Sequence, residues 1–357
     1  MIDIHFGILR TIGFTQSIAN QLGALQDSST TTGVQLMRIV EVQRDWFTLH
    51  DGEAEHAARA LPRLLQSLQQ KEDAFTAGDW VLVRANEIQE LWIESRLAPV
   101  TEIARRANDG RRQPLASNVD TALLAMGLDH DFNPRRMERY IAMVQASGVA
   151  PVVVLTKLDI AIDRDARLAE LRKRLPASVP IVAVNGLSDA ARDELAPWLQ
   201  AGQTLVLLGS SGAGKSTLTN TLTQESQQDT GGVRAGDGRG KHTTTSRSLH
   251  RCPGGACIID TPGLRTWRPD ADGQALAATF EDVESLAPGC RFRDCTHRGE
   301  PGCAVREHVA EDRLLNFHKL LRDAQRGEQT PLQRIAQRQK WKALGKAGHA
   351  RARDKRQ

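Results

Sequence analysis

The sequence predicts a multidomain protein with a small N-terminal β-barrel, a central α/β domain of the P-loop type, and a helical C-terminal domain built around a metal site. Three observations predict this fold class. Short strand-like stretches follow residue 34, apolar strands alternate with helices from about residue 113, and three of the five cysteines cluster near the C-terminus. We place the domains at residues 1–33 (an N-terminal extension), 34–112 (barrel), 113–278 (α/β domain) and 279–357 (metal domain and basic tail).

Composition limits the setting in which this chain works. At 357 residues it is long enough for two or three domains, and no stretch approaches the roughly 20 apolar residues of a membrane span. The N-terminus has no basic segment followed by an apolar one, so we expect no signal peptide, a cytoplasmic location and no membrane association. In the cytoplasm, clustered cysteines are more often metal ligands than disulfides.

The barrel is predicted from four short stretches with strand periodicity. The segment Ser28–Gly33 is typical of a linker, and the stretches "VQLMRIVEV", "DWFTLHDG", "GDWVLVRA" and "QELWIES" follow it. Between the second and third stretches, four leucines recur at helical spacing (Leu61, Leu64, Leu65 and Leu68). They indicate either a helix inserted between strands or a poorly patterned strand.

The α/β domain is predicted beyond a polar boundary at Asn108–Gln113. Its apolar strands are "VDTALLAMGLD", "PVVVLTKLD", "IVAVN", "TLVLLG" and "ACIID". The helix after the first strand has Asn133 as its N-cap and Gly148 at its end. Further helices are expected over 163–175 and 189–199, and again after "TLVLLG".

A phosphate-binding loop joins the fourth of these strands to its helix. The stretch "GSSGAGKS" has the pattern G-x-x-x-x-G-K-[ST], in which backbone N–H groups surround phosphate oxygens. Lys215 would reach the β- and γ-phosphates, and the Ser216 hydroxyl would bind Mg²⁺. The candidate nucleotide-binding residues here are Gly209, Ser210, Ser211, Gly212, Ala213, Gly214, Lys215, Ser216 and Thr217.

Two further motifs follow apolar strands and indicate which nucleotide binds. "DTPG" places Asp260 where an acid holds Mg²⁺ through water and Gly263 where an N–H meets the γ-phosphate. The D-x-x-G pattern is weak alone and gains weight from its position. "TKLD" (Thr156–Asp159) matches the guanine motif [NT]-K-x-D, in which the carboxylate accepts two hydrogen bonds that adenine does not offer. The stem of Lys157 would pack along the base.

The order of these motifs is unusual. In most GTPases the phosphate-binding loop comes first and the guanine motif near the end, whereas here "TKLD" precedes "GSSGAGKS" and "DTPG" comes last. The sequence therefore predicts a circularly permuted GTPase domain that binds GTP and GDP. Permutation is tolerated because the termini of a domain often lie close together.

The cysteine cluster has the spacing of a structural zinc site. Cys290, Cys295, His297 and Cys303 form C-x4-C-x-H-x5-C, and three thiolates with one imidazole complete a closed tetrahedral site. We expect one Zn²⁺ per chain. Cys252 and Cys257 are interpreted as ordinary strand or turn cysteines.

The motif order, the barrel and the cysteine cluster together resemble the ribosome small-subunit-dependent GTPase A family, from about residue 34 onward. The resemblance implies an OB-fold barrel, a permuted GTPase domain and a zinc domain. It also implies that the protein acts late in small-subunit assembly, binds the small (30S) subunit and its rRNA, and hydrolyses GTP when the subunit stimulates it. We expect a monomer.

The resemblance extends to two loops of the nucleotide site. "GKHTTT" (Gly240–Thr245) is similar to the family's switch I, where a threonine closes on Mg²⁺ and the γ-phosphate; Thr244 is favoured and Thr243 stays open. The loop that contacts guanine O6 is usually Ser-Ala in the family, whereas this chain has Asn185 and Gly186. The N–H of Gly186 could still make the contact.

The residue after "DTPG" is Leu264, where many GTPases have a glutamine that orients the attacking water. Leucine cannot form hydrogen bonds, so slow intrinsic hydrolysis is expected and another group must place the water. His242 in the switch I stretch is the candidate catalytic residue, and the alternative is an exposed loop histidine without a role.

The C-terminal tail is strongly basic. From Pro331 onward nine Lys/Arg residues face one acid, which indicates a polyanionic partner such as rRNA or else a solvated terminus. An alternative function remains, a non-catalytic RNA-binding scaffold that holds GTP structurally, and Leu264 is the feature in its favour.

Overall fold

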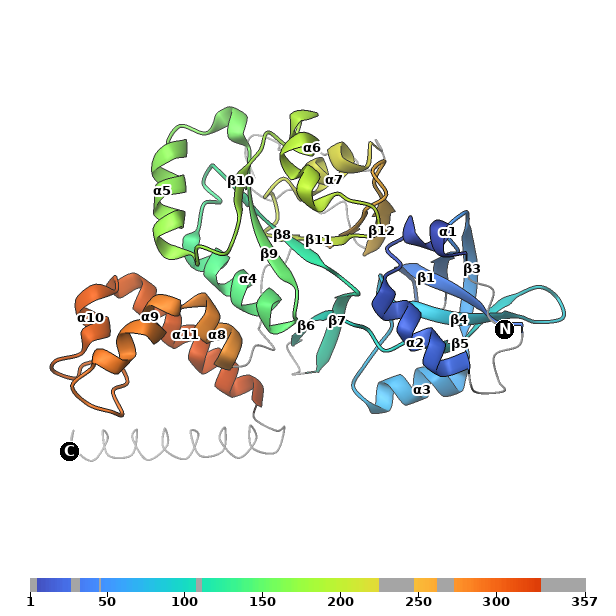
Figure 1. Ribbon diagram of the computed structural model, residues 1–357, viewed down its shortest axis with the longest axis horizontal. Helices are drawn as coiled ribbons and strands as arrows, with labels where there is room; N and C mark the ends of the chain where they lie inside the picture. Colours follow the sequence, from blue (N-terminus) through green and yellow to red (C-terminus); the bar gives the residue numbers. More distant parts are fainter. Residues whose placement is uncertain are drawn as a thin grey trace, which may run out of the picture.

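The computed structural model describes residues 5–26, 33–44, 46–106, 111–224, 247–261 and 273–328. Figure 1 shows three parts in a row: a barrel at one end, an α/β domain in the centre and a helical C-terminal part at the other end. A single 11-stranded sheet has the order β10-β9-β8-β11-β13-β12-β1-β2-β3-β5-β4 and joins the barrel to the α/β domain. No helix of the described residues is long and apolar enough to cross a membrane.

The barrel is five-stranded and closed. Strand β1 (Gln35–Val42) pairs with both β2 (Phe47–His50) and β4 (Trp80–Ala85). Strand β3 (Glu55–Ala60) pairs with β2 and, in parallel, with β5 (Leu91–Arg96), which returns to β4. This closure confirms the predicted OB-like barrel, and β3 is the strand that the sequence analysis did not identify.

Three of the four leucines with helical spacing (Leu64, Leu65 and Leu68) belong to helix α3 (Pro62–Gln70), and Leu61 is its N-cap residue, which settles the open alternative. Proline at the first helical position starts the helix, because its missing N–H is not needed there. Leu68 is buried and Leu64 packs against the barrel core, whereas Leu65 is exposed.

The segment that precedes the barrel forms two packed helices, α1 (Phe6–Arg10) and α2 (Gln16–Gln26). Five apolar side chains of these helices and of the turn between them are buried in the core that also contains residues of the barrel and of the α/β domain. These side chains are Leu9, Ile12, Phe14, Ile18 and Leu22. A hairpin of β6 (Glu102–Arg106) and β7 (Arg112–Ser117) then lies across the predicted domain boundary at residue 112.

The α/β domain has five parallel strands with helices on both faces (Figure 1). The strands are β8 (Thr121–Gly127), β9 (Ala150–Thr156), β10 (Ile181–Ala183), β11 (Thr204–Gly209) and β13 (Cys257–Asp260). Helices α4 (Pro134–Ala146) and α5 (Arg164–Arg174) pack on one face, and α6 (Ala190–Leu195) and α7 (Lys215–Thr223) on the other. As predicted, the Asn133 side chain caps α4, by accepting from the backbone N–H of Arg136.

Strand β12 (Ser248–Arg251) connects the parallel strands of the α/β domain to the barrel within this sheet, because it pairs antiparallel with β13 and meets β1 at Ser248 and Glu41. The C-terminal part contains α8 (Gly273–Thr279), α9 (Glu281–Leu286), α10 (Ala304–His308) and α11 (Glu311–Glu328). Their apolar core includes Phe280 and Phe317, and it reaches α4 through Ala142. The C-terminal helices are therefore packed against the α/β domain on the side of α4.

Candidate functional site

The phosphate-binding loop connects β11 to α7 and is already closed around its lysine. The buried Lys215 ammonium donates to the carbonyls of Gly209, at 3.3 Å, and Ser210, at 2.9 Å. Burial lowers the pKa of Lys215, while the charges of Asp260 and Asp131 oppose that shift. The lysine is thus held at the base of the loop, where its remaining N–H can meet a phosphate.

Glycine is required at two positions of this loop. Gly214 has a φ of +83°, in the left-handed region, and a Cβ there would lie 3.3 Å from the Thr156 hydroxyl. Gly209 faces the neighbouring strand so closely that a Cβ would lie 2.5 Å from the carbonyl oxygen of Ala125. These close approaches give a physical reason for the glycines of the pattern.

The acid of "DTPG" lies beside the phosphate-binding loop. Asp260 ends β13, is buried, and pairs in register with Leu207 of β11. The next hydroxyl, that of Thr261, donates to the Leu207 carbonyl at 2.7 Å. Asp260 therefore lies beside the strand that leads into the phosphate-binding loop, whereas Gly263, Thr243, Thr244, His242 and Leu264 lie outside the described residues.

The guanine motif is linked directly to the phosphate-binding loop. The Thr156 hydroxyl donates to the Ala213 carbonyl at 2.7 Å, so the end of β9 is joined to the phosphate-binding loop. Lys157 has a φ of +60°, and its ammonium lies 2.8 Å from a carboxylate oxygen of Asp129. Asp159 follows in a short 3-10 turn and is exposed, as expected for a side chain that contacts a bound base.

The loop expected at guanine O6 packs against α7. The Gly186 carbonyl accepts from the Thr221 hydroxyl at 2.6 Å, and a Cβ on Gly186 would lie 3.8 Å from a methyl group of Thr217. The Asn185 side chain accepts from the N–H of Leu187 at 3.0 Å, which closes the turn. Asn185 and Gly186 thus stand near the other nucleotide motifs, without the Ser-Ala pair of the family.

The structure adds two residues that the sequence analysis missed, Asp129 and Asp131, in the turn after β8. Asp129 holds Lys157, and Asp131 accepts from the hydroxyl of Ser210 at 2.6 and 2.8 Å. The available signal was a pair of acids directly after an apolar strand, at the sheet edge where ligands of α/β domains bind.

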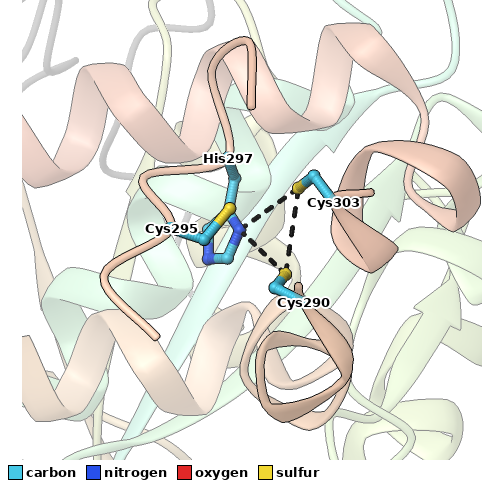
Figure 2. A group of neighbouring side chains, drawn as sticks. All are labelled: Cys290, Cys295, His297 and Cys303. Atoms are coloured by element: carbon cyan, nitrogen blue, oxygen red, sulfur yellow. Dashed lines mark hydrogen bonds between the residues drawn. The ribbon is translucent and has the colours of Figure 1, made fainter. Parts of the chain in front are cut away.

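The cysteine cluster is assembled, as Figure 2 shows, from the turn after α9 and the start of α10. The ligand atoms of Cys290, Cys295, His297 and Cys303 all lie within 4.8 Å of one another. The Sγ atoms of Cys290 and Cys303 are 3.9 Å apart, and His297 Nδ1 lies 3.6 and 3.5 Å from them. Two thiolates on a tetrahedral zinc are about 3.8 Å apart, so this group could hold a metal ion.

The loop that carries His297 is held by one carboxylate. Glu300 accepts from the N–H and hydroxyl of Thr296, at 2.9 and 2.5 Å, and from the N–H groups of Arg298 and Gly299, both at 2.9 Å. These bonds draw the pKa of Glu300 far below its usual range, led by the Thr296 hydroxyl. Because the bonds enclose His297 on both sides, Glu300 fixes the backbone of this ligand.

The comparisons with known proteins agree with this geometry. The family model described as RsgA GTPase matches residues 97–269. The curated protein "Small ribosomal subunit biogenesis GTPase RsgA" of Xanthomonas oryzae pv. oryzae is 42% identical over 317 residues, which covers 87% of this chain and 86% of that protein. The protein of the same name from Xanthomonas axonopodis pv. citri is 41% identical over the same shares.

Two solved structures share the fold. YjeQ from Thermotoga maritima matches 82% of this chain and 98% of its own, with a TM-score of 0.56 and 21% identity. YloQ, described as a circularly permuted GTPase, matches 85% of this chain and 99% of its own, with a TM-score of 0.57 and 19% identity. From the family match, the two curated relatives and the permuted order of its nucleotide motifs, this chain belongs to the RsgA GTPase family.

Proposed function

We propose that this protein binds the small ribosomal subunit and hydrolyses GTP to GDP and phosphate, and that it acts in late assembly of that subunit. The observation that carries the proposal is the hydrogen bond from Thr156 to the Ala213 carbonyl. It joins a guanine motif and a phosphate-binding loop into one site although their order in the chain is permuted. The names of the curated relatives support the subunit as partner.

The roles of the nucleotide residues follow from their positions. Asp159 would select guanine, Lys215 would neutralise phosphate charge, and the N–H groups of the loop would surround the β-phosphate. Ser216 lies in the first turn of α7, where its hydroxyl and Thr244 of switch I would hold Mg²⁺. Mg²⁺ supplies charge neutralisation at the β- and γ-phosphates when bound.

The Cys₃His group would hold one structural Zn²⁺. Its chemistry supports this assignment, because thiolates with imidazole in a closed tetrahedral set are typical of structural rather than catalytic zinc. The group lies among helices that pack on α4 of the GTPase domain. A bound zinc would thus keep the C-terminal surface rigid relative to the nucleotide site.

Contact with rRNA is proposed for the barrel and for the basic tail after Pro331, which lies outside the described residues. Phosphate contacts would dominate the affinity, so binding should weaken steeply with salt. We also propose that the protein is monomeric and works in the cytoplasm. Residues 34–112, 113–278 and 279–357 would serve as rRNA-binding, nucleotide-binding and metal-binding domains.

The deciding experiment is GTP turnover by the full chain alone, with small subunits, with large subunits and with free RNA. We expect slow turnover alone and stimulation by small subunits only. Turnover that no ribosomal particle increases, together with tight GTP binding, would support the scaffold function instead.

A variant whose nine tail Lys/Arg residues are changed to Gln should bind subunits less tightly, with a shallower salt dependence.

A further inference from the structure

The turn after β8 occupies a special place in the nucleotide site. Strand β8 lies between β9, which ends at the guanine motif, and β11, which ends at the phosphate-binding loop. The three strands are parallel, so their C-terminal ends meet at one edge of the sheet. Residues 128–133 therefore stand between the two motifs that recognise the base and the phosphates.

Within this turn, Asp129 is directed to the base side. Its carboxylate lies 2.8 Å from Lys157 Nζ, and its other oxygen accepts from the N–H of Asp131 at 3.0 Å. The side chain is 14% exposed, and Arg167 donates to the backbone carbonyl of Asp129 at 3.0 Å. Lys157 is the residue whose stem would lie along guanine, so Asp129 fixes the ammonium end of that stem.

Asp131 is directed to the phosphate side. Both of its carboxylate oxygens accept from the Ser210 hydroxyl, and one pairs with Arg136 at 2.7 Å. The carbonyl of the same Ser210 accepts from the Lys215 ammonium at 2.9 Å. A chain of contacts thus runs from Asp131 through Ser210 to Lys215, the residue that would meet the β- and γ-phosphates.

We propose that Asp129 and Asp131 are two positioning residues with separate tasks: Asp129 orients Lys157 for the base, and Asp131 orients Lys215 through Ser210 for the phosphates. The proposal rests on the proposed GTPase function and names residues that no motif of the sequence identifies. A general stabilising role would make the two carboxylates equivalent, because they share one turn. Their different partners predict different kinetic effects.

The experiment compares Asp129→Ala, Asp131→Ala, Asp131→Asn and Ser210→Ala in the full chain with small subunits. Asp131→Ala and Ser210→Ala should each lower kcat about tenfold, the effect of one hydrogen bond to a charged group, and should also raise the KM for GTP, because Lys215 would contact the phosphates before and during the reaction. The double variant Asp131→Ala/Ser210→Ala should be no worse than either single variant. Asn at residue 131 keeps an acceptor for Ser210, so it should restore most of the rate. Asp129→Ala should raise the KM for GTP about tenfold and leave kcat unchanged, because it affects uniform binding.

Displacement of a fluorescent GDP by GDP and by GMP separates the tasks without turnover. Asp131→Ala should weaken GDP binding about tenfold and leave GMP binding unchanged, since Lys215 reaches only the outer phosphates. Asp129→Ala should weaken GDP binding and GMP binding by the same factor. The control is Asp165→Asn, which changes an exposed acid on α5 and should alter none of these values.

Two results would overturn the proposal: the same pattern of losses in Asp129→Ala and Asp131→Ala, or additive losses for Asp131→Ala and Ser210→Ala. Failure of the proposed function would look different. The parent chain would then show no subunit-stimulated turnover, whereas the displacement constants would still distinguish the two aspartates.

Discussion

The carboxylate of Glu138 in α4 lies 2.8 Å from the guanidinium of Arg313 in α11, a residue 175 positions later in the chain. Glu138 is fully buried, and it also accepts from Arg174 of α5 at 2.8 Å and from Asn316 of α11 at 2.5 Å. Arg313 continues to Asp282, with both bonds at 2.7 Å. One buried acid thus ties the metal-site helices to two helices of the GTPase domain.

Replacing Glu138 with alanine should therefore lower the free energy of unfolding by about 3–5 kcal/mol, because two arginines lose a buried partner. Denaturant unfolding of the full chain measures this loss. The matched control is Asp312→Asn, which removes a 40% exposed acid that also pairs with Arg174 and should cost about 0–1 kcal/mol. If the two variants lose the same free energy of unfolding, the burial of Glu138 does not strengthen its contribution to stability.

Glu300 offers a test of the metal site. Glu300→Ala removes the acceptor of four hydrogen bonds around His297, so the ligand loop should lose its fixed backbone. Outer-shell partners of this kind typically contribute about 10–100-fold to metal affinity. We expect zinc to transfer to a colorimetric chelator at a correspondingly lower chelator concentration than in the parent.

The same assay includes two references. Glu300→Gln keeps one acceptor oxygen and should lie between the parent and the alanine variant. Cys295→Ser removes a ligand and should give the largest loss, with unfolding of the C-terminal part before nucleotide binding fails. Freshly purified parent protein without zinc in reducing buffer would contradict the zinc assignment itself.

The local sequence patterns and the buried Glu138 differ in how well the sequence predicts them. The N-cap Asn133 and the spacing of the cysteines are local patterns, and each appears in the structure where the sequence predicts it. Glu138 is different, because a charged residue in a helix is expected to face solvent. Its burial depends on Arg174 and Arg313, which only the folded chain brings to it.

The remaining differences have similar causes. Strand β3 has the sequence "EHAARA", with little apolar character, and it is a strand because β2 and β5 lie on both sides of it. Helices α1 and α2 are held by a core shared with the barrel and the central sheet. Asp129 and Asp131 follow an apolar strand in the sequence, and the strand order, with β8 between β9 and β11, is what places them between the two nucleotide motifs.

Asp159 should determine the choice of base. Asp159→Asn removes the paired acceptor for guanine, so binding of GTP and GDP should weaken alike, by about 1–3 kcal/mol. Titration with fluorescent guanine and adenine nucleotides measures both the affinity and the preference. The exposed Asp165→Asn serves as control, and equal binding of ATP and GTP by the parent chain would refute the guanine assignment.

The final prediction concerns hydrolysis. Leu264 cannot orient a water molecule, so another polar group must do so, and His242 lies in a Gly-rich stretch that the subunit could contact. His242→Ala should therefore keep GTP binding and subunit binding while losing most of the stimulated rate. Lys215→Ala should instead impair binding of the phosphates. Single-turnover hydrolysis with saturating subunits distinguishes these effects, because it separates chemistry from binding and product release. If His242→Ala retains the full stimulated rate, the water must be placed by the backbone, by a switch I threonine or by rRNA.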